Sequence, residues 1–152
     1  KIYTAESKTI DFRANEYAWM TENCYKYGFI QRYFDSKSDL TGISGEEWHY
    51  RFVDTPHAAA MNSLGLCLEE YLDMLKTTYS CTSGAPFEIT TDKATFLIYY
   101  VPADNASDIT YIPVPQGAKQ INSNFYSETE FTSGMYTVSG NNTDGFIVTI
   151  VK

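Results

Sequence analysis

The sequence is poor in histidine, cysteine and positive charge. Its 152 residues include 2 His and 3 Cys, and 11 Lys or Arg stand against 19 Asp or Glu, for a formal net charge of -8. The basic residues form no cluster, so the chain lacks the electrostatic footprint of a nucleic-acid-binding protein and the polybasic patch that anionic lipids attract. No apolar run approaches the length that spans a membrane.

The three cysteines, Cys24, Cys67 and Cys81, exclude two common motifs. No two of them have the C-x-x-C spacing of a zinc knuckle or a thioredoxin-type pair. Cys24 and Cys67 fall on apolar helical faces, where a cysteine usually packs as a small buried hydrophobe. A Cys-His hydrolase that uses one of them as nucleophile is an alternative. Neither lies at a helix N-terminus that would lower its thiol pKa.

Apolar and aromatic residues are abundant. Hydrophobic residues make up 43% of the chain and charged residues 20%, which is the composition of a globular protein and not of a disordered one. Aromatic residues reach 16%, including 13 Tyr. The chain begins with Lys1 instead of Met, and we therefore expect a processed product or a piece of a longer protein.

The first half of the chain predicts helices and two strands. Asn15 is a suitable N-cap and Gly28 a suitable stop for the first helix, and Thr55 and Gly65 have the same roles in the second. Residues 34–45 are rich in turn formers and predict a loop. The predicted helices cover 15–27, 55–64 and 67–78, and the predicted strands cover 29–33 and 47–53.

The second half has a different character. After about Tyr79 the helical periodicity ends and Thr, Ile, Val, Tyr and Phe dominate. We predict an α+β protein with a mixed domain over residues 1–78 and a small all-β module over 79–152. The predicted strands of the module are 86–91, 95–101, 109–113, 118–122, 135–139 and 145–151.

Strict alternation in the strand 47–53 separates two faces. Its large apolar side chains are expected to face the core, and His49 and Arg51 to share the more open face. The apolar set is Trp48, Tyr50 and Phe52.

The segment "EEWH" contains the strongest candidate for chemistry. A catalytic zinc takes about three protein ligands, usually His and carboxylate, with a base beside its water. Glu46 and His49 would face opposite ways in a straight strand, but Gly42 and Gly45 permit a turn that brings them together. The alternative is a satisfied polar histidine in a strand. His57, at the start of the second predicted helix, is not expected to be a ligand.

Several segments together resemble one family, the vancomycin-resistance type D-alanyl-D-alanine carboxypeptidases. These belong to the LAS-type zinc peptidases, which include lysostaphin-like peptidases and the hedgehog signalling domain. The order and spacing of the motifs agree over about the first 78 residues, and the end of the chain, "SGNNTDGFIVTI", resembles the appended β module of some members. The matching positions are Tyr27–Ile30, Arg32–Tyr33, Thr41–Ile43, Glu46, Trp48–His49, Arg51, Val53 and Leu68–Leu72.

The resemblance implies a partial LAS-type domain, an antiparallel sheet with helices, and assigns roles to its residues. His49 would bind Zn²⁺ and Glu46 would be the catalytic base, while Arg51 and Trp48 would bind substrate or support the site. Arg51 as a surface ion pair is the alternative. Glu47 and Phe34 stand where the family has proline.

The family's S-x-H-x-x-G-x-A-x-D segment, which supplies the other two zinc ligands, is absent from this sequence. We therefore expect a fragment whose missing N-terminal segment completes the site.

The substrate implied by the resemblance is a peptidoglycan stem peptide that ends in D-alanine, cut as a D,D- or an L,D-carboxypeptidase. Such a substrate implies an extracytoplasmic location at the bacterial surface or envelope, with membrane contact only through an upstream anchor. The alternative function is a non-catalytic module for cell-wall binding or interaction, in which the β module would bind.

Overall fold

The computed structural model describes residues 2–3, 9–10 and 18–152, and it divides the chain into two compact units, Lys1–Glu69 and Glu70–Lys152. The predicted boundary after residue 78 stays a prediction. Within the described ranges, no helix is long and apolar enough to cross a membrane.

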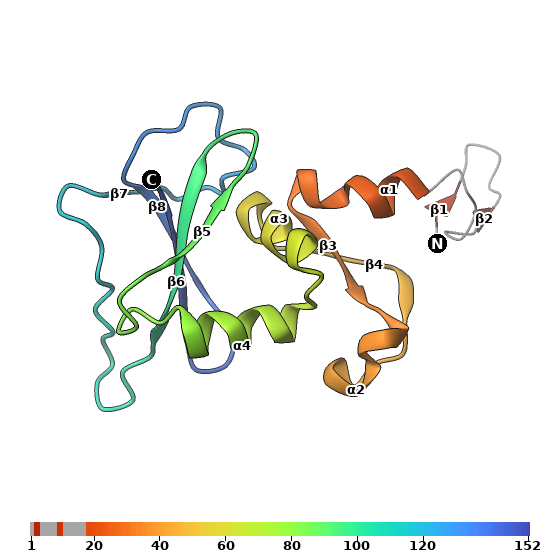
Figure 1. The fold of residues 1–152 in the computed structure, drawn as a ribbon, viewed down its shortest axis with the longest axis horizontal. Coiled ribbons are helices and arrows are strands. Elements are labelled where there is room, and N and C mark those ends of the chain that lie inside the picture. The colour runs from red at the N-terminus through yellow and green to blue at the C-terminus, as the bar shows by residue number, and fades with distance from the viewer. Residues whose placement is uncertain (1, 4–8, 11–17) are drawn as a thin grey trace. The chain divides into compact units, whose positions relative to one another are not determined.

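The first unit is built from short helices and two-stranded ribbons (Figure 1). The predicted first helix is α1 followed by a 3-10 turn, and it ends at Gly28 as expected, while Asn15 lies outside the described residues. The elements are β1 (Ile2–Tyr3), β2 (Thr9–Ile10), α1 (Ala18–Asn23), η2 (Cys24–Tyr27), β3 (Phe29–Tyr33), η3 (Asp35–Lys37), α2 (Ser38–Thr41), β4 (Glu46–Phe52) and α3 (Thr55–Leu64).

The prediction of a loop over residues 34–45 is wrong in part. Residues Asp35–Lys37 form a 3-10 turn, and Ser38–Thr41 form one turn of α-helix that Gly42 ends in the left-handed conformation, with φ 71°. Ser, Asp and Gly favour turns, and here the turns are wound into consecutive helical turns. This compact connection joins β3 to β4.

Gly28 is required where η2 leads into β3. Its φ of 78° is left-handed, and a Cβ there would lie 2.7 Å from Phe52 Cε2 and 3.1 Å from the Asp54 backbone. The Gly28 carbonyl also accepts a hydrogen bond of 2.8 Å from Val53 N. A glycine is therefore needed for both the turn and the close approach of the two strands.

The helix α3 begins differently from its prediction. Its N-cap is Asp54 and not Thr55: the Asp54 carboxylate accepts a hydrogen bond of 2.8 Å from Thr55 N. Asp54 holds a φ of 72°, which turns the chain sharply out of β4. Pro56 then occupies the first turn, where its missing N–H costs nothing, and Gly65 ends the helix as predicted.

The second unit contains a five-stranded sheet of order β5-β6-β9-β8-β7 (Figure 1). Its pairings are antiparallel except for β7 with β8, which is parallel. Helix α4 (Leu68–Thr78) begins in the first unit and continues into the second, and it buries Tyr71 and Leu75 as its periodicity predicts. The strands are β5 (Phe87–Thr90), β6 (Thr95–Pro102), β7 (Lys119–Gln120), β8 (Met135–Gly140) and β9 (Gly145–Val151).

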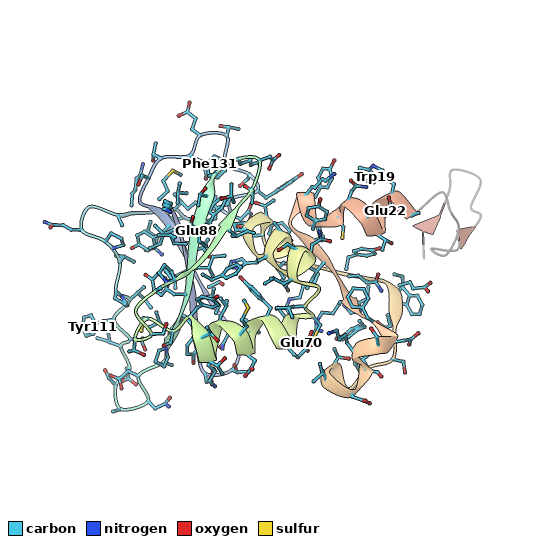
Figure 2. All side chains as sticks on the ribbon, in the orientation of Figure 1. Trp19, Glu22, Glu70, Glu88, Tyr111 and Phe131 are labelled. Atoms are coloured by element: carbon cyan, nitrogen blue, oxygen red, sulfur yellow. The ribbon has the colours of Figure 1, made fainter. Side chains whose placement is uncertain are left out.

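The predicted strand over residues 109–113 is absent from the sheet. Residues 109–115 have alternating exposure: Ile112 and Val114 pack on the core, whereas Ile109 and Tyr111 are exposed, and Tyr111 projects at the margin of its unit (Figure 2). Pro113 and Pro115 have no N–H to donate to a neighbouring strand. The segment therefore covers the core without joining the ladder.

Candidate functional site

Glu46 and His49 are in direct contact on β4. His49 Nδ1 lies 2.9 Å from Glu46 Oε2, with 45% and 32% of the two side chains exposed. The two side chains of the "EEWH" motif therefore meet, although both lie within β4. The pair lies within reach of solvent, as a site for an external ligand requires.

A shift in strand register accompanies this contact between residues three apart. Phe29 pairs with Phe52 and Gln31 with Tyr50, but Tyr33 pairs with Glu46, so β4 has two more residues than β3 over this interval. A bulge disturbs the regular geometry of a strand locally. The contact between Glu46 and His49 lies within this irregular interval.

The start of β4 is held by Asp35. Its carboxylate accepts a hydrogen bond of 2.7 Å from Gly45 N, the residue just before Glu46. A Cβ at position 45 would lie 2.7 Å from the Asp35 carboxylate oxygen, so glycine is required for this approach. The sequence analysis did not identify Asp35 as a site residue. The only signal in the sequence was that an aspartate, a turn-forming residue, stands in the same loop as the glycine that precedes the strand.

The hydrogen bond between Glu46 and His49 determines the chemical state of the imidazole. When Glu46 is a carboxylate, it accepts a hydrogen bond from Nδ1–H, and in the neutral imidazole the lone pair then lies on Nε2. Nε2 is the nitrogen that could hold a metal ion. Glu46 uses Oε2 in this contact, and its Oε1 has no hydrogen-bond partner among the residues that the structure describes.

The expectation that the apolar face of β4 packs in the core is wrong. Trp48 is 51% exposed and Phe52 is 39% exposed. The ribbon β3-β4 has only two strands among the described residues, and the elements that contact β3 include α3 and the 3-10 turn η2, which leave much of β4 exposed. Trp48 is therefore a surface aromatic near His49 in sequence and not a packed support.

Arg51 is an exposed residue on β4, two positions after His49. It forms no ion pair with any residue in the described ranges, so the alternative of a surface ion pair has no support there. Its proposed contact with a substrate carboxylate stays a prediction.

Arg32 and Tyr33 form a contact network that ends at His49. Arg32 donates to both carboxylate oxygens of Glu69, with Nη1 to Oε2 at 3.0 Å, and its guanidinium lies 4.6 Å from the centre of the Tyr33 ring. The Tyr33 ring meets the His49 ring edge to face at 4.9 Å. Partial burial opposes ionisation of Glu69, but the hydrogen bonds that this carboxylate accepts, first among them those from Arg32, and the positive charge of Arg32 together lower its pKa.

The donor set suits a zinc ion chemically but is incomplete. His49 and Glu46 are residue types that bind zinc or assist it, and a catalytic site takes three protein ligands. No group of three His, Cys, Asp or Glu that could hold a metal occurs among residues 2–3, 9–10 and 18–152. The described residues account for at most part of such a site.

Cys24 and Cys67 are poorly placed to act as nucleophiles. Burial raises the pKa of the Cys24 thiol, which opposes formation of the reactive thiolate. Cys67 lies immediately before α4, so the expectation that it is not at a helix N-terminus is wrong, but only 2% of its surface is exposed. The burial of each thiol weighs against the Cys-His hydrolase.

His57 is a structural histidine that predicts a pH effect on stability. Burial lowers its pKa from 6.5 to about 4, against a smaller opposing effect of Asp54. The unfolded chain therefore takes up the proton first as the pH falls. We expect full stability well above pH 6.5 and a loss of about 3 kcal/mol in unfolding free energy as the pH falls to 4.

Urea denaturation at a series of pH values tests this expectation, with His57→Asn as control. The difference in unfolding free energy between the two proteins should change in that window. A constant difference would contradict the assignment.

Comparison with known proteins defines the class of the fold. The solved vancomycin-resistance D,D-dipeptidase VanXYg, in complex with a D-Ala-D-Ala phosphinate analog, matches 95% of this chain and 52% of its own, with 34% identity and a TM-score of 0.73. This match confirms the predicted α+β class with a LAS-type domain followed by a β module.

Sequence matches give the family. Residues 4–55 match the family model described as VanY: D-alanyl-D-alanine carboxypeptidase. A D-alanyl-D-alanine carboxypeptidase of Enterococcus faecium is 40% identical over 141 residues, which are 91% of this chain and 37% of that protein. The chain is therefore related to the VanY-type D-alanyl-D-alanine carboxypeptidases, as the motifs predicted, and it spans 37% of the length of this relative.

One further solved structure matches locally. It is a mutant of the vancomycin-resistance D,D-pentapeptidase VanY from a VanB-type cassette, in complex with Zn(II). It is 51% identical over 38% of this chain and 33% of its own, with a TM-score of 0.37.

Proposed function

We propose that this chain contributes Glu46 and His49 to the site of a zinc-dependent carboxypeptidase that removes terminal D-alanine from peptidoglycan stem peptides. The observation that carries the proposal is the contact between the two side chains, 2.9 Å from His49 Nδ1 to Glu46 Oε2. It occurs in a chain related to D-alanyl-D-alanine carboxypeptidases. The two further zinc ligands are proposed to lie outside this chain.

Each of the two residues has a separate part in the proposed reaction. His49 would hold zinc through Nε2, because Nδ1 is engaged by Glu46. Bound zinc would polarise the carbonyl of the terminal peptide bond and make its water more acidic. Glu46 would accept a proton from the attacking water through Oε1 and pass it to the amine of the departing D-alanine.

Two exposed side chains would bind the substrate. Arg51 is a cation on the same strand, and it can pair with the terminal carboxylate of a stem peptide. Trp48 offers an exposed ring for packing against the peptide. Peptidoglycan lies outside the cytoplasm, so we place the protein at the bacterial surface or envelope.

The test compares the full-length product of the gene with this 152-residue chain. Zinc content and D-alanine release are measured for both, on peptides ending in D-Ala-D-Ala and in L-residue–D-Ala. We expect the full-length protein to bind one zinc and release D-alanine, and His49→Ala to abolish both. A full-length protein that holds no zinc and releases no D-alanine would overturn the proposal. Sedimentation with purified peptidoglycan would then test the wall-binding alternative.

A further inference from the structure

Tyr33 contacts the candidate site but has no role in the function proposed above. It pairs with Glu46 across the ribbon, and its ring contacts His49 edge to face, with centroids 4.9 Å apart. Regular pairing would set Tyr33 opposite Trp48 instead. The two-residue shift in register therefore sets Tyr33 opposite Glu46, where its ring also contacts His49.

The Tyr33 ring is itself held from its other side. The Arg32 guanidinium lies 4.6 Å from the centre of the ring, within the range of a cation–π contact. Arg32 is fixed by hydrogen bonds from both of its terminal nitrogens to Glu69, and its side chain is 12% exposed. Two hydrogen bonds fix the orientation of the planar guanidinium. The ammonium group of a lysine at this position has no such plane and could not be held in the same way.

His49 is thus constrained by two contacts of different kinds. The hydrogen bond to Glu46 fixes where Nδ1 points, and the Tyr33 ring limits rotation of the imidazole about its side-chain bonds. A half-exposed histidine with only one hydrogen bond would sample several rotamers. The second contact therefore limits how freely Nε2 can move.

We propose that Tyr33, braced by Arg32 and Glu69, is a positioning residue that orients the His49 imidazole. The proposal rests on the function proposed above for its catalytic meaning, but the orientation is a property of this chain alone. The Tyr33 hydroxyl has no hydrogen bond with the residues that the structure describes. The ring of Tyr33, and not its hydroxyl, therefore orients His49, so phenylalanine at this position should preserve the orientation.

The first experiment is NMR of the His49 ring in this chain without metal. The chain has 2 His, so a His57→Asn background leaves His49 as the single histidine signal. We expect Tyr33→Leu to average the three-bond Hα–Hβ couplings of His49 over several rotamers, which loss of the ring current alone would not do. Tyr33→Phe should keep these couplings near their original values, and Arg32→Lys should give a smaller change in the same direction as Tyr33→Leu.

The matched control is Phe52→Leu. Phe52 lies on the same strand as His49 and makes an edge-to-face contact of 5.2 Å with Phe29, so its loss removes a similar ring contact from the same ribbon. Urea denaturation shows whether each variant is folded. His49 couplings that stay unchanged in a folded Tyr33→Leu, or that change equally in Phe52→Leu, would overturn the proposal.

The second experiment uses the full-length protein. Tyr33→Leu should lower kcat for D-alanine release about tenfold with little change in KM, as loss of a group supporting a metal-bound histidine does. Tyr33→Phe should restore kcat. If the full-length protein is active and Tyr33→Leu leaves its kcat unchanged, the proposal that Tyr33 supports catalysis through His49 is overturned. If the NMR result holds and no variant releases D-alanine, the function proposed above fails and the positioning of His49 stands.

Discussion

Replacement of Glu46 by glutamine should reduce kcat for D-alanine release by the full-length protein by about 10²- to 10⁴-fold, the usual contribution of a general base. Glutamine has the shape of glutamate, and its carbonyl oxygen can still accept a hydrogen bond from His49 Nδ1. It cannot accept a proton from water. The geometry of the His49 contact, 2.9 Å in the native chain, should therefore survive while turnover is lost.

The neighbouring carboxylate provides a matched control for this variant. Glu47 is exposed and adjacent on the same strand, and Glu47→Gln makes the same chemical change one residue away. Steady-state D-alanine release and zinc content are measured for both variants. Equal kcat in Glu46→Gln and the native protein would show that Glu46 only orients His49. A loss of kcat confined to Glu47→Gln would show that Glu47, and not Glu46, is the base.

The second large effect is expected in the core of the sheet unit. Phe96 is fully buried and makes edge-to-face contacts with Phe125 at 4.9 Å and Phe131 at 5.9 Å. Phe96→Ala should lower the unfolding free energy of this unit by about 3–5 kcal/mol, since it removes apolar contacts and leaves a cavity between rings that cannot close around it.

The measurement must separate the two units. Both tryptophans, Trp19 and Trp48, belong to the first unit, so tryptophan fluorescence reports on that unit, and far-UV circular dichroism is needed for the sheet. Tyr111→Ala is the control, because Tyr111 is 86% exposed and its removal should change stability by less than about 0.5 kcal/mol. Similar denaturation midpoints for both variants would contradict the assignment of Phe96 to the core.

The periodic segments were predictable because their signals are local. Helix α4 and strands β3, β5, β6, β8 and β9 lie close to their predicted positions, since each has an apolar pattern or a turn residue within a few positions of its ends. Strand 109–113 was wrong for a reason that is not local. Its alternation is real, but two prolines and the absence of a neighbouring strand keep it out of the ladder.

The sequence by itself identified the residues of the candidate site and the family that the chain resembles. It could do so because the glycines of residues 42–45, Glu46 and His49 form one short motif along the chain. It did not determine that the two side chains would touch. That contact lies where the register of β4 against β3 shifts by two residues, between Gln31 and Tyr33. Register is set by pairing between segments distant in sequence, and a shift changes which side chains lie opposite one another.

The tertiary structure also decided the contacts of two residues that the sequence identified only as matches to the family. Tyr33 and Arg32 belong to a motif shared with the family, but nothing local indicates that one ring meets His49 and that the other side chain is fixed by Glu69, 37 positions away. The exposure of Trp48 could not be predicted either. Alternation predicts that a strand has two faces, but it does not show whether other elements pack against each face. Only the folded ribbon decides these contacts.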